Sequence, residues 1–306
     1  MSLGVLDIVG FIAGSLGIWG FGTNLIPDAT NQASNYQNAG GGIQNMKTYN
    51  EYGALIGSGR NGNEYIGNGN PGQISCPQDN AQQAATTEFY ADNDAICLAY
   101  ITATWPDGQQ WGWVGDWGME CGLLWYESGI QLQSSAGNGS SPACTWVDGD
   151  HTNGIQAGVI GISWSSFKAN TSEAATDTNA CGSSFRAWTN DGGDQLLSPG
   201  GLLSTRDVAS RNATRPSQRM DDRLVVSHRG NANATRLCES ETSWGPDFIS
   251  MGESLYCNME THELVPLCVN GITTDCFEVD GPQGHAHVAT DGTRNVKNTS
   301  SVVEWK

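Results

Sequence analysis

The chain has 306 residues, of which only 15% are charged, and it contains 40 glycines and 11 tryptophans. Its formal net charge of −18 argues against nucleic acid as a partner, because acidic side chains repel phosphates. The low charge and the many turn-forming Gly, Asn and Ser residues predict a mainly β fold rather than a helical one.

The first segment, residues 1–22, is apolar and nearly uncharged, and its glycines recur every three or four positions. On a helix this spacing gathers the glycines on one face and leaves large apolar side chains on the rest. We therefore expect an N-terminal apolar helix with a flat seam that lets another backbone approach closely. The residues expected to make its contacts are Gly10, Phe11, Gly14, Gly17, Trp19 and Phe21.

Three roles for this helix remain open. It packs in the protein's own core, it associates with a second copy of the chain, or it inserts into a membrane. The third role follows from a glycine and aromatic content similar to that of viral fusion peptides. Asp7 and the absence of Lys or Arg before Lys47 do not fit a secretory signal peptide, and Asp7 also disfavours a membrane-spanning helix.

Residues 23–75 are rich in Gly and Asn, and their Asn-Gly pairs favour hairpin turns, although disorder fits the composition as well.

The next expected domain, residues 76–190, is rich in tryptophan. Residues 95–105 are a long strand candidate, 106–108 a turn, and 109–114 the return strand. This pattern predicts a β-sandwich-like central domain.

An arginine-bearing segment follows at residues 191–236. It is either a solvated linker or a cationic arm that docks on the acidic first 200 residues or on a partner. Seven of the chain's ten arginines lie in 31 residues of it, namely Arg206, Arg211, Arg215, Arg219, Arg223, Arg229 and Arg236. A Cys-rich module at residues 237–280 and a tail at 281–306 complete the expected organisation.

The cysteines predict disulfides. Four of them in residues 237–280 predict a small module with two bridges, in any of three pairings, and their spacings of 18, 10 and 7 residues lack the close pairs that hold zinc. The five earlier cysteines are odd in number, so one of them is free or pairs with another chain. The nine candidates are Cys76, Cys97, Cys121, Cys144, Cys181, Cys238, Cys257, Cys268 and Cys276.

Sequons for N-glycosylation occur five times, always in polar, turn-like sequence. Together with nine cysteines they favour a secreted glycoprotein at the cell surface or outside the cell. The acceptor residues are Asn138, Asn170, Asn212, Asn233 and Asn298.

The sequence contains none of the common nucleophile-elbow, zinc-helix, P-loop or dinucleotide motifs, and we predict no cofactor and no metal. The polar run at residues 148–154 departs from an EF-hand, because Asn153 and Val159 stand where that loop needs glycine and an acid. A hydrogen-bonded turn, a calcium loop and a catalytic Asp–His pair all fit this run. His285 and His287 suggest either a metal site or an exposed tail.

The richest mixture of acidic and aromatic residues lies between positions 111 and 127. Sugar-active sites combine carboxylates with aromatic platforms, so Asp116, Glu120 and Glu127 are candidates for a glycosidase or lectin-like groove. Tryptophans buried in a β core explain the same residues. The aromatic residues concerned are Trp111, Trp113, Trp117, Trp125 and Tyr126.

Three stretches carry a resemblance to a known group of proteins. They are residues 96–117 (ICLAYITATWPDGQQWGWVGDW), 144–154 (CTWVDGDHTNG) and 237–250 (LCESETSWGPDFIS). Together they resemble secreted, cysteine-containing proteins of unknown function from filamentous ascomycete fungi. The resemblance implies secretion and transfers no catalytic residue.

The sequence thus favours a secreted, non-enzymatic glycoprotein that forms a homo-oligomer, or binds another partner, through its apolar N-terminal segment. The alternatives are an extracellular protein that inserts into membranes, and a protein that binds or hydrolyses carbohydrate, such as a cell-wall glycan, through the Trp-lined acidic cluster.

Overall fold

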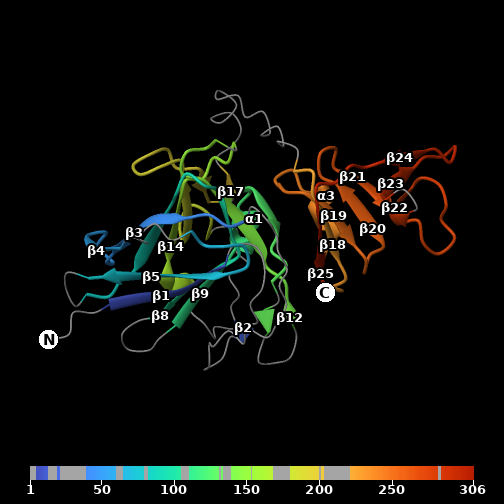
Figure 1. The fold of residues 1–306 in the computed structure, drawn as a ribbon. Helices are drawn as coiled ribbons and strands as arrows, with labels where there is room; N and C mark the ends of the chain where they lie inside the picture. Colours follow the sequence, from blue (N-terminus) through green and yellow to red (C-terminus); the bar gives the residue numbers. More distant parts are fainter. Residues whose placement is uncertain are drawn as a thin grey trace. The chain divides into compact units, whose positions relative to one another are not determined.

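The computed structural model describes residues 5–12, 19–20, 39–59, 65–78, 82–104, 110–130, 132–133, 139–152, 154–167, 180–199, 201–202, 221–281 and 284–306. The chain divides into two compact units, Met1–Pro216 and Ser217–Lys306. Both are built mainly of β-strands, as the composition predicts (Figure 1).

Two larger sheets form the body of the first unit. A five-stranded antiparallel sheet has the order β15 (Phe185–Trp188), β14 (Val159–Ser163), β6 (Thr86–Ala91), β3 (Ile43–Tyr49) and β4 (Leu55–Gly59). A four-stranded antiparallel sheet has the order β5 (Pro71–Pro77), β1 (Val5–Ile12), β8 (Tyr100–Thr104) and β9 (Gln110–Val114).

Shorter elements complete this unit. A three-stranded sheet joins β10 (Trp125–Glu127), β13 (Ala143–Val147) and β7 (Ile96–Leu98), and another joins β12 (Gly139–Ser140), β11 (Leu132–Gln133) and β2 (Trp19–Gly20). Strands β16 (Leu197–Ser198) and β17 (Gly201–Leu202) pair with each other. The helical elements among the described residues of this unit are α1 (Asp116–Glu120) and the 3-10 helix η1 (Trp164–Phe167).

Alternation along the strands decides which side chains are buried. Met46, Phe89, Ile160 and Phe185 of the five-stranded sheet are at most 1% exposed and lie in one core with residues of the four-stranded sheet. Trp113 of β9 stacks on Phe185 of β15 with 5.3 Å between ring centroids. The opposite face of the five-stranded sheet therefore does not pack in this core.

The N-terminal helix predicted for residues 1–22 is wrong where the structure describes them. Residues Val5–Ile12 form strand β1, which lies between β5 and β8 and slips register between Val9 and Phe11. Four β-branched residues in eight favour this strand, and the glycines that suggested a helix seam also disfavour helix.

The hairpin predicted for residues 95–114 is confirmed in its second half. Strands β8 and β9 pair from Tyr100↔Val114 to Thr104↔Gln110. The first strand is not continuous, because β7 pairs with β13 in a different sheet. The fully buried Ala99 lies at the point where the chain passes from one sheet to the other.

Four disulfides tie the two units internally, and both bridges predicted in the C-terminal module are present. The pairs are Cys97–Cys144, Cys121–Cys181, Cys238–Cys257 and Cys268–Cys276. The ninth cysteine, Cys76, lies outside these bridges; it is fully buried, with its Sγ 3.3 Å from Oγ1 of Thr48. Bridges of this number are typical of proteins that fold in an oxidising, extracellular environment.

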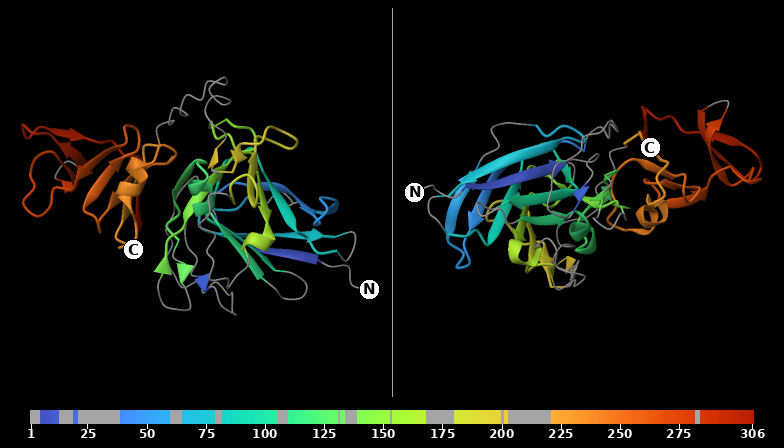
Figure 2. Two further views of the ribbon diagram at one scale, coloured as in Figure 1. Left: turned by 180° about the vertical axis from the view of Figure 1, so that it is seen from behind. Right: turned by 90° about the horizontal axis from the view of Figure 1, so that it is seen from below.

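The second unit contains a five-stranded sheet and a three-stranded sheet (Figure 2). The first has the order β21 (Glu263–Pro266), β20 (Leu255–Asn258), β19 (Asp247–Ser250), β18 (Leu224–Ser227) and β25 (Val302–Trp305), with β18 parallel to both neighbours. The second has the order β22 (Cys276–Gly281), β23 (Gly284–Val288) and β24 (Arg294–Val296). Helix α3 (Ala234–Glu239) precedes β19.

Parts of the segments expected as linker and tail therefore lie in regular structure. Strand β18 and the start of helix α3 come from residues 191–236, and β23, β24 and β25 come from residues 281–306. Four of the seven clustered arginines, Arg206, Arg211, Arg215 and Arg219, lie outside the described residues.

Candidate functional site

The tryptophan-rich acidic cluster lies mostly in the core. Trp113, Trp125 and Tyr126 are 0% exposed, Trp111 is 6% exposed and Glu127 is 1% exposed. The structure thus supports the buried-core interpretation of these aromatic residues.

The other two carboxylates of this cluster lie at opposite ends of α1. Asp116 begins α1 and accepts a hydrogen bond from the backbone N–H of Ala143 at 3.2 Å, while Glu120 ends the same helix and is exposed. The ring of Trp117 meets Phe167 edge-on, with 5.5 Å between centroids. Ala143 is also the register partner of Glu127, so Asp116 and the buried Glu127 flank the same residue, whereas Glu120 is exposed at the other end of α1.

The polar run at residues 148–154 forms a hydrogen-bonded turn. Oδ1 of Asp150 accepts from the backbone N–H of Thr152 at 3.0 Å, and this contact is the main reason that the pKa of Asp150 is lowered. The backbone N–H of Gly154 donates to the carbonyl of His151 at 2.9 Å. No group of three or more His, Cys, Asp or Glu suited to a metal is found in the described part of the chain, whether here or near His285 and His287.

The sequon and N-terminal residues are only partly described. Asn233 and Asn298 are exposed, and Oδ1 of Asn233 caps α3 by accepting from the backbone N–H of Arg236 at 2.6 Å. Gly10 and Phe11 lie in β1, and Trp19 lies in β2. The other candidates, Asn138, Asn170, Asn212, Gly14, Gly17 and Phe21, lie outside the described residues.

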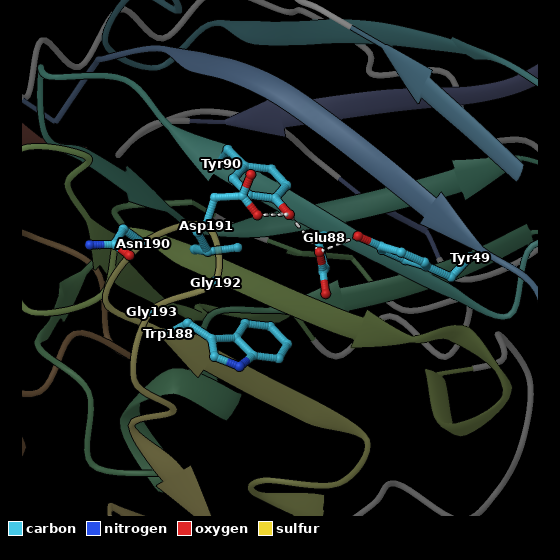
Figure 3. A pocket seen from close by; sticks show the side chains of 9 residues that line it. Tyr49, Glu88, Tyr90, Trp188, Asn190, Asp191, Gly192 and Gly193 are labelled. Carbon is cyan, nitrogen blue, oxygen red and sulfur yellow. Dashed lines mark hydrogen bonds between the residues drawn. The ribbon is translucent and has the colours of Figure 1, made fainter. Parts of the chain in front are cut away.

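A pocket of about 290 Å³ lies on the outer face of the five-stranded sheet (Figure 3). Three strands place side chains on this face in the same pattern, a charged residue followed two positions later by an aromatic residue that lines the pocket. The pairs are Lys47 and Tyr49 on β3, Glu88 and Tyr90 on β6, and Arg186 and Trp188 on β15. Because alternate residues of a strand share a face, both members of each pair point away from the core.

The register aligns these side chains in two rows across the sheet. One row runs through Lys47, Glu88, Gly161 and Arg186, and the other runs through Tyr90, Val159 and Trp188. Gly161 of β14 is thus the direct neighbour of Glu88 and Arg186, and it places no side chain between them.

The carboxylate of Glu88 is the polar centre of the pocket. The hydroxyls of Tyr49 and Tyr90 donate to the same oxygen, Oε2, at 2.9 and 2.6 Å. Burial, followed by the hydrogen bond to Glu88, raises the pKa of Tyr49 to about 12 and raises the pKa of Tyr90 as well. Both hydroxyls therefore keep their protons at neutral pH and act as donors.

The second carboxylate, Asp191, closes one side of the pocket. Its Oδ2 lies 2.6 Å from Nζ of Lys47, and its Oδ1 lies 3.3 Å from the hydroxyl of Tyr90. The same ammonium lies 4.7 Å from the centroid of the Tyr90 ring. Lys47 therefore balances the charge of Asp191 and anchors the loop to β3.

This loop is a tight turn over residues 190–193. The backbone N–H of Gly193 donates to the carbonyl of Asn190 at 2.9 Å, and Gly192 has a φ of 71°. A positive φ at the third position of a four-residue turn requires glycine or asparagine, so the Asn-Asp-Gly-Gly sequence suits this conformation. The turn holds Asn190 and Asp191 at the edge of the pocket.

The indole of Trp188 provides the apolar wall. A Cβ built on Gly161 would lie only 2.7 Å from Cζ3 and 2.9 Å from Cη2 of Trp188, so the edge of the six-membered ring of the indole lies against that glycine. The guanidinium of Arg186 lies 5.5 Å from the ring centroid. The half-buried Trp188 therefore presents a flat surface beside Glu88.

Sequence reasoning missed this pocket. Its signal was the repeated charge-x-aromatic pairs at positions 47–49, 88–90 and 186–188, which lie in three widely separated strands. Comparison with known proteins adds nothing to the geometry: no protein-family model, no curated protein and no solved structure matches the chain. The described part of the chain also contains no helix that is long and apolar enough to cross a membrane.

Proposed function

We propose that this protein is a secreted glycan-binding protein, and that the pocket on the outer face of the five-stranded sheet is its binding site. The observation that carries the proposal is that Trp188, which lies against Gly161, lines the same pocket as Glu88, the register neighbour of that glycine. A flat aromatic surface receives the apolar face of a sugar ring, and a carboxylate next to it accepts hydrogen bonds from the hydroxyls. The four disulfides and the exposed sequons Asn233 and Asn298 support an extracellular location.

The size of the pocket sets the size of the ligand. At about 290 Å³ it lies near the lower limit of pockets that bind small molecules, which span roughly 300–1,000 Å³. We therefore expect the pocket to hold one sugar ring, while neighbouring rings of a longer glycan remain outside it.

The charges favour binding over hydrolysis. A general acid of a glycosidase works in apolar surroundings that keep its proton at neutral pH. Asp191 is instead 63% exposed and paired with Lys47, and Tyr49 and Tyr90 are held as donors to Glu88. This arrangement fixes the orientation of Glu88, which suits the binding of a ligand.

The test is binding of the full, secreted chain to a panel of soluble glycan oligomers and insoluble cell-wall polysaccharides, measured by calorimetry and by pull-down. Replacement of Trp188 by Ala should weaken binding at least about tenfold, because the platform is lost. Tyr52→Ala is the matched control, since Tyr52 is 86% exposed and lies outside the pocket. Absence of binding to every glycan, or equal binding by the Trp188→Ala variant, would overturn the proposal.

A further inference from the structure

The carboxylate of Glu88 has one oxygen committed to the protein and one available to a ligand. Both tyrosine hydroxyls donate to Oε2, and no hydrogen bond from the described residues reaches Oε1. Figure 3 shows this second oxygen directed away from the two hydroxyls, on the side of the pocket where Trp188 lies. A ligand that rests on the indole therefore meets Oε1.

Glu88 also has no cation of its own within the described part of the chain. Lys47 stands opposite Glu88 in the register of β3 and β6, but its ammonium pairs with Asp191. Arg186 lies beyond Gly161 in the same row, and its guanidinium lies against the ring of Trp188. The negative charge of Asp191 is thus balanced, while that of Glu88 is left for the ligand.

The surroundings reinforce this local charge. Residues 1–200 contain 18 acidic and four basic residues, which gives a formal charge of −14. Such a field attracts cationic ligands and repels anionic ones, including glycans that carry carboxylate or sulfate groups.

Resting on the proposed glycan-binding function, we propose that the pocket selects a glycan whose sugars carry a protonated primary amine, as in a polymer of glucosamine. The apolar face of one ring stacks on the indole of Trp188, and its ammonium group pairs with Oε1 of Glu88. The amine supplies a counter-charge to Glu88, and the sugar ring supplies the apolar face that stacks on Trp188.

The experiment compares three oligomers of equal length, namely glucosamine, N-acetylglucosamine and glucose, by calorimetry with the full chain. We expect the glucosamine oligomer to bind at least about tenfold more tightly than the other two. Raising the salt concentration from about 50 to about 500 mM should weaken the binding of the glucosamine oligomer only, because salt screens the ion pair and not the stacking.

Glu88→Gln is the decisive variant, since it removes the charge and keeps an oxygen that accepts from Tyr49 and Tyr90. It should bring the three affinities to within about twofold of one another, whereas Trp188→Ala should weaken all three. The exposed Tyr52→Ala variant should bind as the unaltered protein does.

The outcomes separate this proposal from the one on which it rests. Equal binding of the three oligomers, unchanged by Glu88→Gln, would overturn amine selectivity and leave glycan binding intact. If the protein binds none of these oligomers and no other glycan, the proposed function itself is overturned. An oligomer of lysine that binds as tightly as the glucosamine oligomer would show recognition of charge alone and would also overturn the proposal.

Discussion

At the level of single residues, the geometry of the pocket depends on Gly161, which is not itself among the residues that line it. Gly161 has no side chain, and this absence allows the edge of the indole of Trp188 to lie close to β14. A glycine inside a strand often marks such a close approach by a neighbouring side chain. Gly161 is thus a positioning residue for Trp188.

Replacing Gly161 by Ala tests this role directly. The new methyl group would occupy the space under Cζ3 and Cη2 of Trp188, so the indole must tilt away from Glu88. We expect glycan affinity to fall about tenfold or more while the unfolding temperature changes little, because the ring can turn outward into solvent. Calorimetric titration and thermal melting, measured on the same sample, check the two halves of this prediction. An equal loss of stability and affinity would point to a general packing role instead.

Tyr49 and Tyr90 make the first unit sensitive to alkaline pH. The pKa of Tyr49 rises from 10.0 to about 12, and the pKa of Tyr90 rises as well. Burial is the main cause in both residues, and the hydrogen bond to Glu88 is the second. In the folded state these hydroxyls keep their protons where the unfolded chain loses them. Their contribution to stability is therefore complete below pH 10 and is lost as the pH rises from 10.0 toward about 12.

The expected result is an unfolding temperature that falls over this alkaline range, and that falls less steeply in Tyr49→Phe and Tyr90→Phe variants. Circular dichroism melts at several pH values give the slopes. The pKa of Tyr256, in the second unit, is also raised, so the comparison between variants carries the test rather than the slope of the unaltered protein. Identical slopes in all three proteins would contradict the prediction.

At the level of elements, the disulfides close loops of very different length. Cys121 and Cys181 are 60 residues apart and tie the end of α1 to the segment before β15, whereas Cys268 and Cys276 are eight residues apart. In the chain-entropy model the stabilisation grows with loop length, and it is about 4 kcal/mol for the long loop and about 2.5 kcal/mol for the short one.

Replacing both cysteines of a pair by Ser should therefore destabilise the first unit more at Cys121–Cys181 than the second unit at Cys268–Cys276. Denaturant unfolding of the full chain, followed by probes assigned to each unit, gives the two free energies. The opposite order would show that packing around the bridges outweighs the loop entropy.

Local patterns predicted some elements and misjudged others. The β8–β9 hairpin follows from alternation and a Pro-Asp-Gly turn, all within 20 residues of sequence. The spacing of glycines in residues 1–22 fits one face of a helix, whereas the four β-branched residues of Val5–Ile12 favour a strand. The outcome depends on pairing with β5 and β8, which lie far along the chain. The pocket was missed for the same reason, since β3, β6 and β15 become neighbours only through the sheet.

At the level of the whole molecule, the N-terminal segment contributes a strand to the first compact unit, whereas its composition suggested a separate helix. Self-association or membrane insertion through residues 1–22 stays a prediction, but β1 is an interior strand of the first unit. Deleting this segment cannot test assembly alone, because it also opens the four-stranded sheet.

We expect a chain without residues 1–22 to lose the cooperative unfolding transition of Met1–Pro216 and to retain that of Ser217–Lys306. Removal of an interior strand leaves β5 and β8 without partners on one side, which a sheet of four strands does not tolerate. Differential scanning calorimetry resolves the two transitions. Light scattering of a Gly14→Leu variant is the better test of assembly, since it changes the predicted contact and keeps the strand.

The alternation of pocket and core residues has a consequence for how such a protein diversifies. Glu88, which faces the pocket, has core residues on both sides of it in sequence, namely Thr87 and Phe89, which are at most 1% exposed. Substitutions at ligand-facing positions can therefore change specificity without disturbing the core, whereas the insertion of one residue would exchange the two faces. Point mutations at pocket-facing positions can thus alter ligand specificity, as long as the lengths of the strands stay constant.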